Sequence, residues 1–331
     1  MSNSSAERNL YMFVASDFGL YVFKRDDNGW TQVRGGLENE HVTSVTARFG
    51  AILAGTRAGV QRSVDLGQSW WPLMSGLNEP YVRWVTYHPD GSGRAFAGTE
   101  PAAIFVLRQD EETWRECAEV ARLRDANEWS LPYSPQAGCV RGFAFHGSRG
   151  YAAVEQGGLL VSDDRGASWQ LAGGSEGKPQ EPQQETQIHP DVHAVGVHPS
   201  SPNTVVAPTG GGLYVSSDGG DHWQRRHDCY CRAVWVDPLR ADHMILGSAE
   251  SVDRDGRIEE TIDGGQTWQL RMAGLPAVWP EHMVERFHQA GDELLAVLSN
   301  GELIAAPLDT LAWHTVVPGV QEVNAVMTLE A

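Results

Sequence analysis

Short apolar segments, bounded by clusters of Gly, Pro, Asn and Asp, recur along the whole chain. One example is Val192 to Val197, in which apolar and polar positions alternate until His198-Pro199 breaks the pattern. Two more short segments follow, Thr204 to Ala207 and Leu213 to Ser216, and Trp223 opens a fourth. Alternation with a period of two between turn residues is typical of β-strands. The pattern therefore predicts a unit of four antiparallel strands.

The motif S/T-x-D-x-G-x-x-W occurs four times, at Ser63 to Trp70, Ser162 to Trp169, Ser216 to Trp223 and Thr261 to Trp268. A tryptophan recurs at the same place in every predicted unit, giving seven anchors: Trp30, Trp70, Trp114, Trp169, Trp223, Trp268 and Trp313. A repeat of this length indicates a repeat architecture, and four-stranded units are the blades of propellers. The sequence therefore predicts an all-β fold, a seven-bladed β-propeller of four-stranded antiparallel blades.

The two ends of the chain predict how the ring closes. The first strand, Leu10 to Ala15, corresponds to the second strand of a blade, and Val323 to Thr328 is a spare inner strand. Pairing them removes exposed sheet edges, which are a liability in β-proteins. We therefore expect the C-terminal strand to complete blade 1. Residues 9–331 then form one propeller domain, preceded by a disordered tail, residues 1–8.

The repeated motif is identified as the Asp box, or BNR repeat, of sialidase-like β-propellers. The resemblance implies that the motif carboxylates stabilise a turn between the third and outer strands, away from any pocket. It extends over the chain to single-propeller bacterial proteins often labelled exo-α-sialidase, including Gly98-Thr99-Glu100-Pro101 and Asp191-Val192-His193. The sialidases have six blades and an Arg-Ile-Pro element that this chain lacks. Seven-bladed relatives include xyloglucan hydrolases and a photosystem assembly factor that is not an enzyme.

The composition argues against several classes of binding partner. The net charge is −18, and no apolar run is long enough to cross a membrane. An acidic chain without basic runs is expected to bind neither nucleic acid nor anionic membranes. The first residues lack the apolar core of a signal peptide, and four cysteines are too few for a disulfide framework. These features predict a cytoplasmic protein.

The turn at the end of each inner strand gives a reference point for locating the candidate site residues. His88, His146, His198 and Asp237 share one register at the end of the inner strand, so we interpret them as turn residues and not as catalytic groups. Five positions earlier stand Arg83, Arg141, His193 and Arg232, with Thr43, Met283 and Asn324 in the other blades. Arginines from neighbouring blades should ring one end of the channel, and arginine suits planar recognition of carboxylate or phosphate. The alternative is a structural ion network, in which these residues pair with Glu100, Glu155 and Asp191.

Two functions remain open. In the first, the channel mouth binds a small anionic, carboxylated and sugar-like ligand, and the resemblance implies that it acts as a glycoside hydrolase or lyase. The ligand-binding candidates are Arg83, Arg141, Arg232, Glu100 and Trp129. The catalytic candidates are Glu155, Asp191, His193 and Tyr230. In the second, the propeller is a non-catalytic platform for a protein partner.

Two segments of the chain contain candidate metal ligands. His227, Cys229 and Cys231 alternate along one segment, and so do His189, Asp191 and His193. Imidazole and thiolate suit zinc or copper. However, no pair of cysteines has zinc-site spacing, and Arg232 adjoins the thiols, so small buried cysteines are the favoured interpretation. We expect no cofactor.

Overall fold

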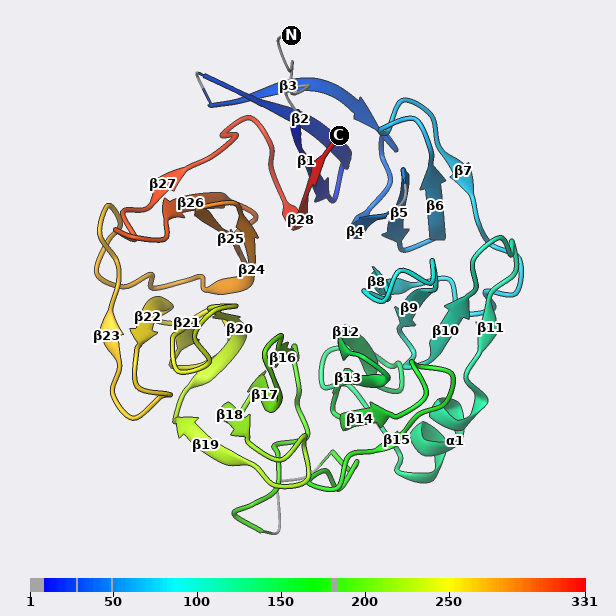
Figure 1. Ribbon diagram of the computed structural model, residues 1–331, viewed down its shortest axis with the longest axis vertical. Helices are drawn as coiled ribbons and strands as arrows, with labels where there is room; N and C mark the ends of the chain where they lie inside the picture. The colour runs from blue at the N-terminus through cyan, green and yellow to red at the C-terminus, as the bar shows by residue number, and fades with distance from the viewer. Residues whose placement is uncertain (1–8, 28, 49, 180–183) are drawn as a thin grey trace, which may run out of the picture.

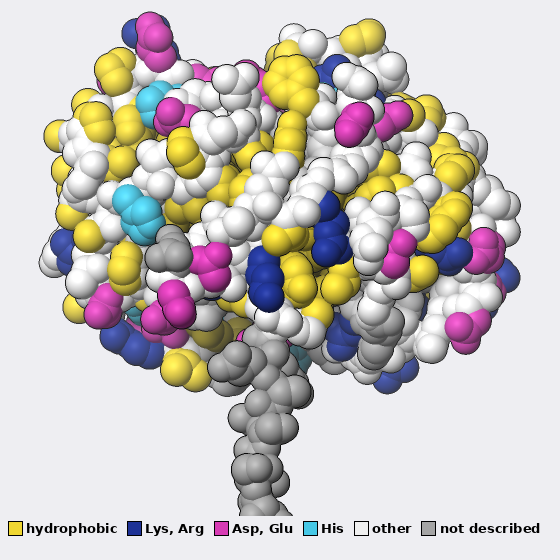
Figure 2. Space-filling model, turned by 90° about the horizontal axis from the view of Figure 1, so that it is seen from above, with side chains coloured by type: hydrophobic (Ala, Val, Ile, Leu, Met, Phe, Trp, Pro, Cys, Tyr) yellow, Lys and Arg dark blue, Asp and Glu magenta, His cyan; other side chains and the backbone are white. Residues whose placement is uncertain are grey.

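Seven four-stranded antiparallel sheets surround a common axis, as expected (Figure 1). This computed structural model describes residues 9–27, 29–48, 50–179 and 184–331, so the predicted tail over residues 1–8 lies outside the described residues. No helix of the described part is long and apolar enough to span a membrane. Seen from the side of blade 1, acidic and basic side chains are interspersed with apolar ones (Figure 2).

The strands of the first four blades, innermost first, are as follows. Blade 1 contains β28 (Val323–Glu330), β1 (Leu10–Ser16), β2 (Gly19–Asp26) and β3 (Gly29–Gly36). Blade 2 contains β4 (Val42–Arg48), β5 (Ala51–Thr56), β6 (Gly59–Ser63) and β7 (Trp71–Pro72). Blade 3 contains β8 (Val82–Tyr87), β9 (Ala95–Thr99), β10 (Ile104–Leu107) and β11 (Arg115–Glu116). Blade 4 contains β12 (Cys139–His146), β13 (Arg149–Glu155), β14 (Gly158–Ser162) and β15 (Gln170–Leu171).

The last three blades follow the same order. Blade 5 contains β16 (Gly196–His198), β17 (Ser201–Thr209), β18 (Gly212–Ser216) and β19 (Gln224–His227). Blade 6 contains β20 (Tyr230–Val236), β21 (Met244–Ala249), β22 (Arg257–Thr261) and β23 (Gln269–Leu270). Blade 7 contains β24 (Val284–Ala290), β25 (Glu293–Leu298), β26 (Leu303–Pro307) and β27 (His314–Thr315). The helix α1 (Ala118–Ala126) lies in the insertion between blades 3 and 4.

The C-terminal strand closes the ring. Strand β28 pairs antiparallel with β1, with Leu10 opposite Glu330 and Ala15 opposite Ala325. The backbone amide of Asn9 also donates a hydrogen bond to the carbonyl of Ala331 at 3.0 Å. The two ends of the chain therefore share blade 1 (Figure 1), which confirms the predicted closure.

The four repeated motifs fold into the same hydrogen-bonded turn. In blade 4 the Ser162 hydroxyl donates to Asp164 at 2.8 Å, and the amides of Gly166 and Ser168 donate back to these two side chains. The same contacts recur around Asp65, Asp218 and Asp263. A side chain at Gly166 would meet Phe96 of blade 3 at 2.4 Å, which accounts for the glycine. The motif carboxylates are turn-forming residues, as expected.

Tryptophans hold consecutive blades together. The indole of Trp114 donates to the carbonyl of Leu73 in the preceding blade at 2.9 Å, and Trp313 donates to Arg271 in the same way at 3.0 Å. Trp223 is 1% exposed and packs in a core shared by blades 4 and 5. The anchors therefore bury the faces on which the blades meet.

The histidines of the inner turns also link the blades. The imidazole of His146 contacts the carbonyl of Pro199 at 3.0 Å, and His198 contacts the carbonyl of Asp237 at the same distance. Because a carbonyl oxygen only accepts, each ring donates from Nε2. Each contact joins one blade to the next, which confirms the interpretation of these histidines as turn residues.

The inner strand of blade 5 is shorter than predicted. The expected strand was Val192 to Val197, but β16 begins only at Gly196, and Val192 forms an isolated bridge with Thr209. Pro208 in the facing strand β17 has no N–H to donate to the ladder. The regular pairing therefore stops before it reaches the channel mouth.

We predict that Trp223→Ala destabilises the protein by about 3–5 kcal/mol, because truncating a buried aromatic side chain leaves a cavity. Urea unfolding followed by circular dichroism measures the loss. The matched control is Trp71→Ala on the outer strand β7, where the side chain is 48% exposed and the expected loss is below about 1 kcal/mol. Equal losses in the two variants would contradict the anchoring role.

Candidate functional site

In six blades one residue of the inner strand is displaced from the ladder at the same end of the channel, and in blade 5 His193 occupies the corresponding place before β16. In blade 4, for example, the register shifts between Val140 and Gly142, which leaves Arg141 unpaired in the ladder. A bulge of this kind re-aims a side chain. The residues at these places, from blade 1 to blade 7, are Asn324, Thr43, Arg83, Arg141, His193, Arg232 and Glu285.

In blade 7 the expected register was wrong. The sequence predicted Met283 at the mouth, but the displaced residue is Glu285, and Met283 is fully buried. Strand β24 ends at Ala290, so Glu285 lies five positions before its turn, as Arg141 does before His146 in blade 4. The turn of blade 7 thus lies two residues later than the sequence predicted. Counting back from the turn therefore missed an acidic residue at the centre of the site.

Six of these seven residues, all except His193, line a cavity of about 460 Å³ at the channel mouth. Its wall contains five arginines and only two carboxylates; these are Arg57, Arg83, Arg141, Arg232, Arg286, Glu285 and Glu322. Three aromatic side chains, Tyr81, Tyr133 and His41, and the polar Thr43, Ser299 and Asn324 complete the polar lining. The mouth of this acidic protein is thus locally basic.

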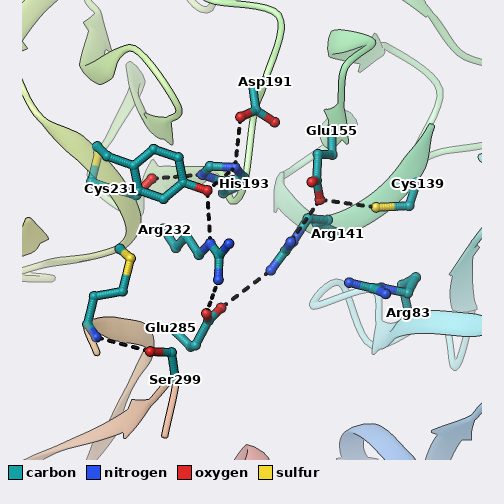
Figure 3. Close-up of polar contacts among 12 residues, drawn as sticks. Arg83, Cys139, Arg141, Glu155, Asp191, His193, Cys231, Arg232, Glu285 and Ser299 are labelled. Atoms are coloured by element: carbon teal, nitrogen blue, oxygen red, sulfur yellow. Dashed lines mark hydrogen bonds and ion pairs between the residues drawn. The ribbon is translucent and has the colours of Figure 1, made fainter. Parts of the chain in front are cut away.

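Three of these arginines form ion pairs, and Figure 3 shows those of Arg141 and Arg232. Arg83 contacts Glu100 at 3.0 Å, and Arg141 contacts Glu155 at 2.8 Å. Glu285 accepts from Arg232 and lies 3.5 Å from Arg141. The structural network that the sequence left open therefore exists for Arg83 and Arg141, whereas Asp191 contacts His193 at 3.2 Å.

The other two arginines form no ion pair with any carboxylate of the described residues. The guanidinium of Arg286 lies 4.1 Å from the ring centre of Trp84, which belongs to blade 3 on the other side of the channel. Burial, followed by repulsion from Arg141, lowers the pKa of Arg286 to about 9. Arg57 lies over Tyr81 at 5.5 Å. These two cations therefore retain unsatisfied donors at the cavity.

The predicted catalytic residues come together, but behind the cavity wall. His193 contacts the carbonyl of Cys231 through Nδ1 at 2.9 Å, and through Nε2 it contacts Asp191 at 3.2 Å and the Tyr230 hydroxyl at 3.3 Å. Arg232 donates to the same hydroxyl at 3.1 Å. None of Glu155, Asp191, His193 and Tyr230 lines the mouth cavity.

Their protonation states do not suit acid catalysis. Burial alone would raise the pKa of Glu155, but Arg141 outweighs it and holds that pKa well below its usual range. His193 likewise lowers the pKa of Asp191 against the effect of burial. Burial raises the pKa of Tyr230 to about 12. Two ionised carboxylates cannot serve as the general acid of a glycosidase, and the phenol of Tyr230 stays neutral.

Two predicted ligand-binding residues do not reach the cavity. Trp129 is 3% exposed, donates its indole N–H to the carbonyl of Gly177 at 2.6 Å and packs in the core of blade 4. Glu100 lies behind Arg83 and accepts a hydrogen bond from Ser134 at 2.7 Å. The aromatic residue that the same insertion does bring to the mouth is Tyr133, which is 57% exposed.

Sequence reasoning missed Arg57, Arg286 and Glu285. Arg57 occupies the turn between β5 and β6, and such turns open on the mouth side of each blade. Arg286 directly follows Glu285 in the sequence Val284-Glu285-Arg286. Aligning the blades on the start of each inner strand, instead of on its turn, would have found the last two.

One set of side chains has the spacing of a metal site within the described part of the chain. Ligand atoms of Glu155, Asp191 and His193 lie within 4.8 Å of one another. Arg141 already neutralises Glu155, and its charge opposes a cation there. His227, Cys229 and Cys231 do not form such a set among these residues.

The chain matches no family model and no curated protein. Solved structures share its fold at low identity. An ancestral GH74 enzyme is 16% identical with a TM-score of 0.61, over 87% of this chain and 38% of that one. YCF48 bound to D1 peptide is 15% identical with a TM-score of 0.55, over 89% and 90% of the chains. Chaetomium thermophilum Sqt1, bound to the N-terminus of ribosomal protein L10, is 12% identical with a TM-score of 0.55, over 92% and 82%.

These matches establish the β-propeller fold, and this chain spans well under half of the GH74 enzyme. The structures include both an enzyme and proteins bound to peptides or protein segments. Likeness at this level of identity leaves the function to the chemistry of the site.

We predict that Glu155→Gln destabilises the protein at pH 7 by about 3–5 kcal/mol, because it leaves the buried Arg141 without its carboxylate. The folded-state pKa of Glu155 is lowered, so its contribution is fully present above its unfolded pKa of about 4.3 and is lost as the pH falls below it. Urea unfolding at pH 7 and at pH 4 and below should show the difference from wild type shrinking. The control is Glu112→Gln, where the side chain is 70% exposed and little change is expected.

Proposed function

We propose that the channel-mouth cavity binds a small anionic ligand, and specifically a carboxylated, sugar-like molecule. The observation that carries the proposal is the imbalance of the cavity wall, which contains five arginines against two carboxylates. Like charges brought together in a cavity cost free energy unless an anion compensates them. In a chain of net charge −18, this concentration of arginine is a local feature of the mouth.

The unpaired arginines would make the principal contacts. Arg83, Arg141 and Arg232 direct part of their hydrogen-bonding capacity to protein carboxylates. Arg57 and Arg286 retain theirs, and each is held in place by an aromatic ring. A planar guanidinium with two adjacent N–H groups binds a carboxylate in a bidentate manner. The two side chains therefore suit the acidic group of a ligand.

The rest of the wall suits a polyol. Thr43, Ser299 and Asn324 provide hydroxyl and amide groups, and Tyr81 and Tyr133 provide aromatic surfaces. A cavity of about 460 Å³ with a few convergent polar groups has the size of a small-molecule site. This combination favours a sugar acid over a bare inorganic anion.

We do not propose that the protein hydrolyses this ligand. A glycosidase acid needs a raised pKa, whereas the pKa values of Glu155 and Asp191 are lowered. Both carboxylates also lie behind the cavity wall. We therefore propose a binding protein and not a glycoside hydrolase, in the cytoplasm as the composition suggests.

A protein partner is the second candidate. The observation that favours it is the match with YCF48, which covers 90% of a propeller bound to a peptide, against 38% of the GH74 enzyme. An acidic side chain or a terminal carboxylate of a peptide would satisfy the same arginines. The two candidates thus share one anion site and differ in what carries the anion.

We predict that glucuronate raises the melting temperature of the wild type and that Arg286→Gln weakens its binding about tenfold or more. The reason is that a hydrogen bond to a charged group contributes about 1.5–3 kcal/mol. Isothermal titration calorimetry measures the affinity, with glucose as the neutral analogue and a short glutamate-rich peptide as the second probe. Arg115→Gln on the outer strand β11 is the control and should bind like the wild type.

The outcomes separate the candidates. Binding of glucuronate but not of the peptide supports the small-molecule site, and binding of the peptide alone supports the platform. If neither probe binds the wild type, or if Arg286→Gln binds as tightly as the wild type, the proposed anion site is wrong.

A further inference from the structure

A second cavity, of about 560 Å³, lies between blades 5 and 6 and contains a cysteine in its wall. Cys229 is half-buried in the segment that connects β19 to β20, and it forms no disulfide. Cys229 is therefore among the residues that a small molecule in this cavity meets. The proposed anion site does not involve this cysteine.

Three side chains that alternate along this segment act together. His227 ends β19, Cys229 follows two residues later, and Cys231 lies in β20. His227 and Cys231 each stand two residues from Cys229 along the chain, and both lower the pKa of its thiol. Cys231 is fully buried and also contacts the carbonyl of Thr209 at 3.7 Å. Cys229 is thus the accessible member of a pair of thiols.

Glu259 completes the arrangement. Its carboxylate lies 3.0 Å from Nε2 of His227 and 3.3 Å from Arg257, and it accepts a hydrogen bond from the hydroxyl of Ser248. The ring of His227 also packs against Trp268, with the ring centres 5.2 Å apart. His227 is therefore held by a carboxylate and lies two residues before the thiol of Cys229, and a thiol with an imidazole and a carboxylate nearby is the set of groups that activates a cysteine nucleophile.

The charges of these groups agree with their geometry. The hydrogen bond from Cys231 is the main cause that lowers the pKa of Cys229 to about 6, against burial, and His227 lowers it further. Burial opposes the charged form of His227, but its contacts with Cys229 and Glu259 outweigh this effect and raise its pKa to about 10. A thiolate beside an imidazolium is the expected state at neutral pH.

Other ionisable groups also face the cavity. They come from the loop before blade 5, from blade 5 and from blade 6, and they are His189, Tyr214, Arg225, Asp228, Tyr230, Glu250 and Arg257. Arg225 contacts Asp228 at 3.1 Å, and Arg257 contacts Glu259. These pairs balance one another, so the cavity does not demand a charged reactant.

The other cysteines differ from Cys229. Burial raises the pKa of Cys117 and of Cys139 to about 12. Burial and the contact with Cys229 raise the pKa of Cys231 well above its usual value. Cys229 is thus the one cysteine of the four whose thiol is both activated and open to a cavity.

We propose that Cys229 is a nucleophilic thiolate that undergoes thiol–disulfide exchange with small disulfides entering this cavity. The Cys229 sulfur attacks one sulfur of the disulfide and forms a new S–S bond. The original S–S bond breaks, and the leaving thiolate takes a proton from solvent. Cys229 is oxidised to a mixed disulfide, and half of the small disulfide is reduced to a thiol. His227 and Glu259 are positioning residues, which act by keeping the sulfur ionised.

The test measures the reaction of each cysteine with iodoacetamide and with hydroxyethyl disulfide, by peptide mass spectrometry over a range of pH. In the wild type we expect Cys229 to react first, with a rate that is half-maximal near pH 6. In His227→Asn the midpoint should move toward the ordinary cysteine pKa of about 8.5. The rate at pH 6 should then fall by less than about tenfold, because Cys231 still lowers the pKa and the larger nucleophilicity of the more basic thiolate offsets part of the lost ionisation.

Two controls accompany this test, a variant without the thiol and a measurement of folding. Cys229→Ser should form no adduct under the same conditions, and circular dichroism reports whether each variant folds. The pH profile of the wild type alone tests the proposal if His227→Asn does not fold. A wild-type midpoint above pH 8, or faster labelling of Cys117, Cys139 or Cys231 than of Cys229, would overturn it.

Discussion

The packing of each twisted sheet between two neighbours is the constraint on which this structure depends. Apolar side chains fill both faces of every blade, so no blade buries its own surface. One core, for instance, combines Ile245 of blade 6 with Leu294 and Trp313 of blade 7. Only a closed ring covers every face, and the pairing of β28 with β1 provides that closure. The tryptophans and the glycines of the repeated turns follow from the same requirement, because they allow neighbouring sheets to approach closely.

Closure of the ring also creates the mouth. Once the inner strands are in register, a bulge in six of them brings six side chains to a single rim. Arg83 and Arg141 have carboxylate partners, Glu100 and Glu155, from their own blades. Glu285 is different, because it lies on blade 7 and contacts arginines of blades 4 and 6. The charged network therefore connects blades that are not adjacent, and the channel is where such contacts are possible.

Much of the fold was predictable because its determinants are local. Trp223, His198 and the carboxylate of Asp164 each act within a turn or between sequential blades, so their spacing in the sequence reports their role. The site depends instead on which residue of each inner strand reaches the channel mouth, and this is set by contacts between blades that are far apart in the sequence. Met283 was expected where Glu285 lies, because the turn after β24 lies two residues later than predicted; counted from Ala290, the spacing is the same as in blade 4. Trp129 was expected in the pocket because it lies in an insertion, yet the insertion folds back to bury it.

The position of each charged group relative to a cavity decides what it can do. Glu155 is buried against Arg141, so its charge is fixed and its role is structural. Arg286 lines both the mouth cavity and a deeper channel cavity of about 210 Å³, and it forms no ion pair with a described carboxylate. A cation held by an aromatic ring at this boundary can meet an anion without giving up a protein partner.

The same reasoning separates the carboxylates behind the mouth from the thiol between blades 5 and 6. The carboxylates of Glu155 and Asp191 contact Arg141 and His193 and do not line the mouth cavity. Cys229, in contrast, lines a cavity of its own, and its neighbours lower the pKa of its thiol. We therefore propose anion binding at the mouth and nucleophilic chemistry between blades 5 and 6.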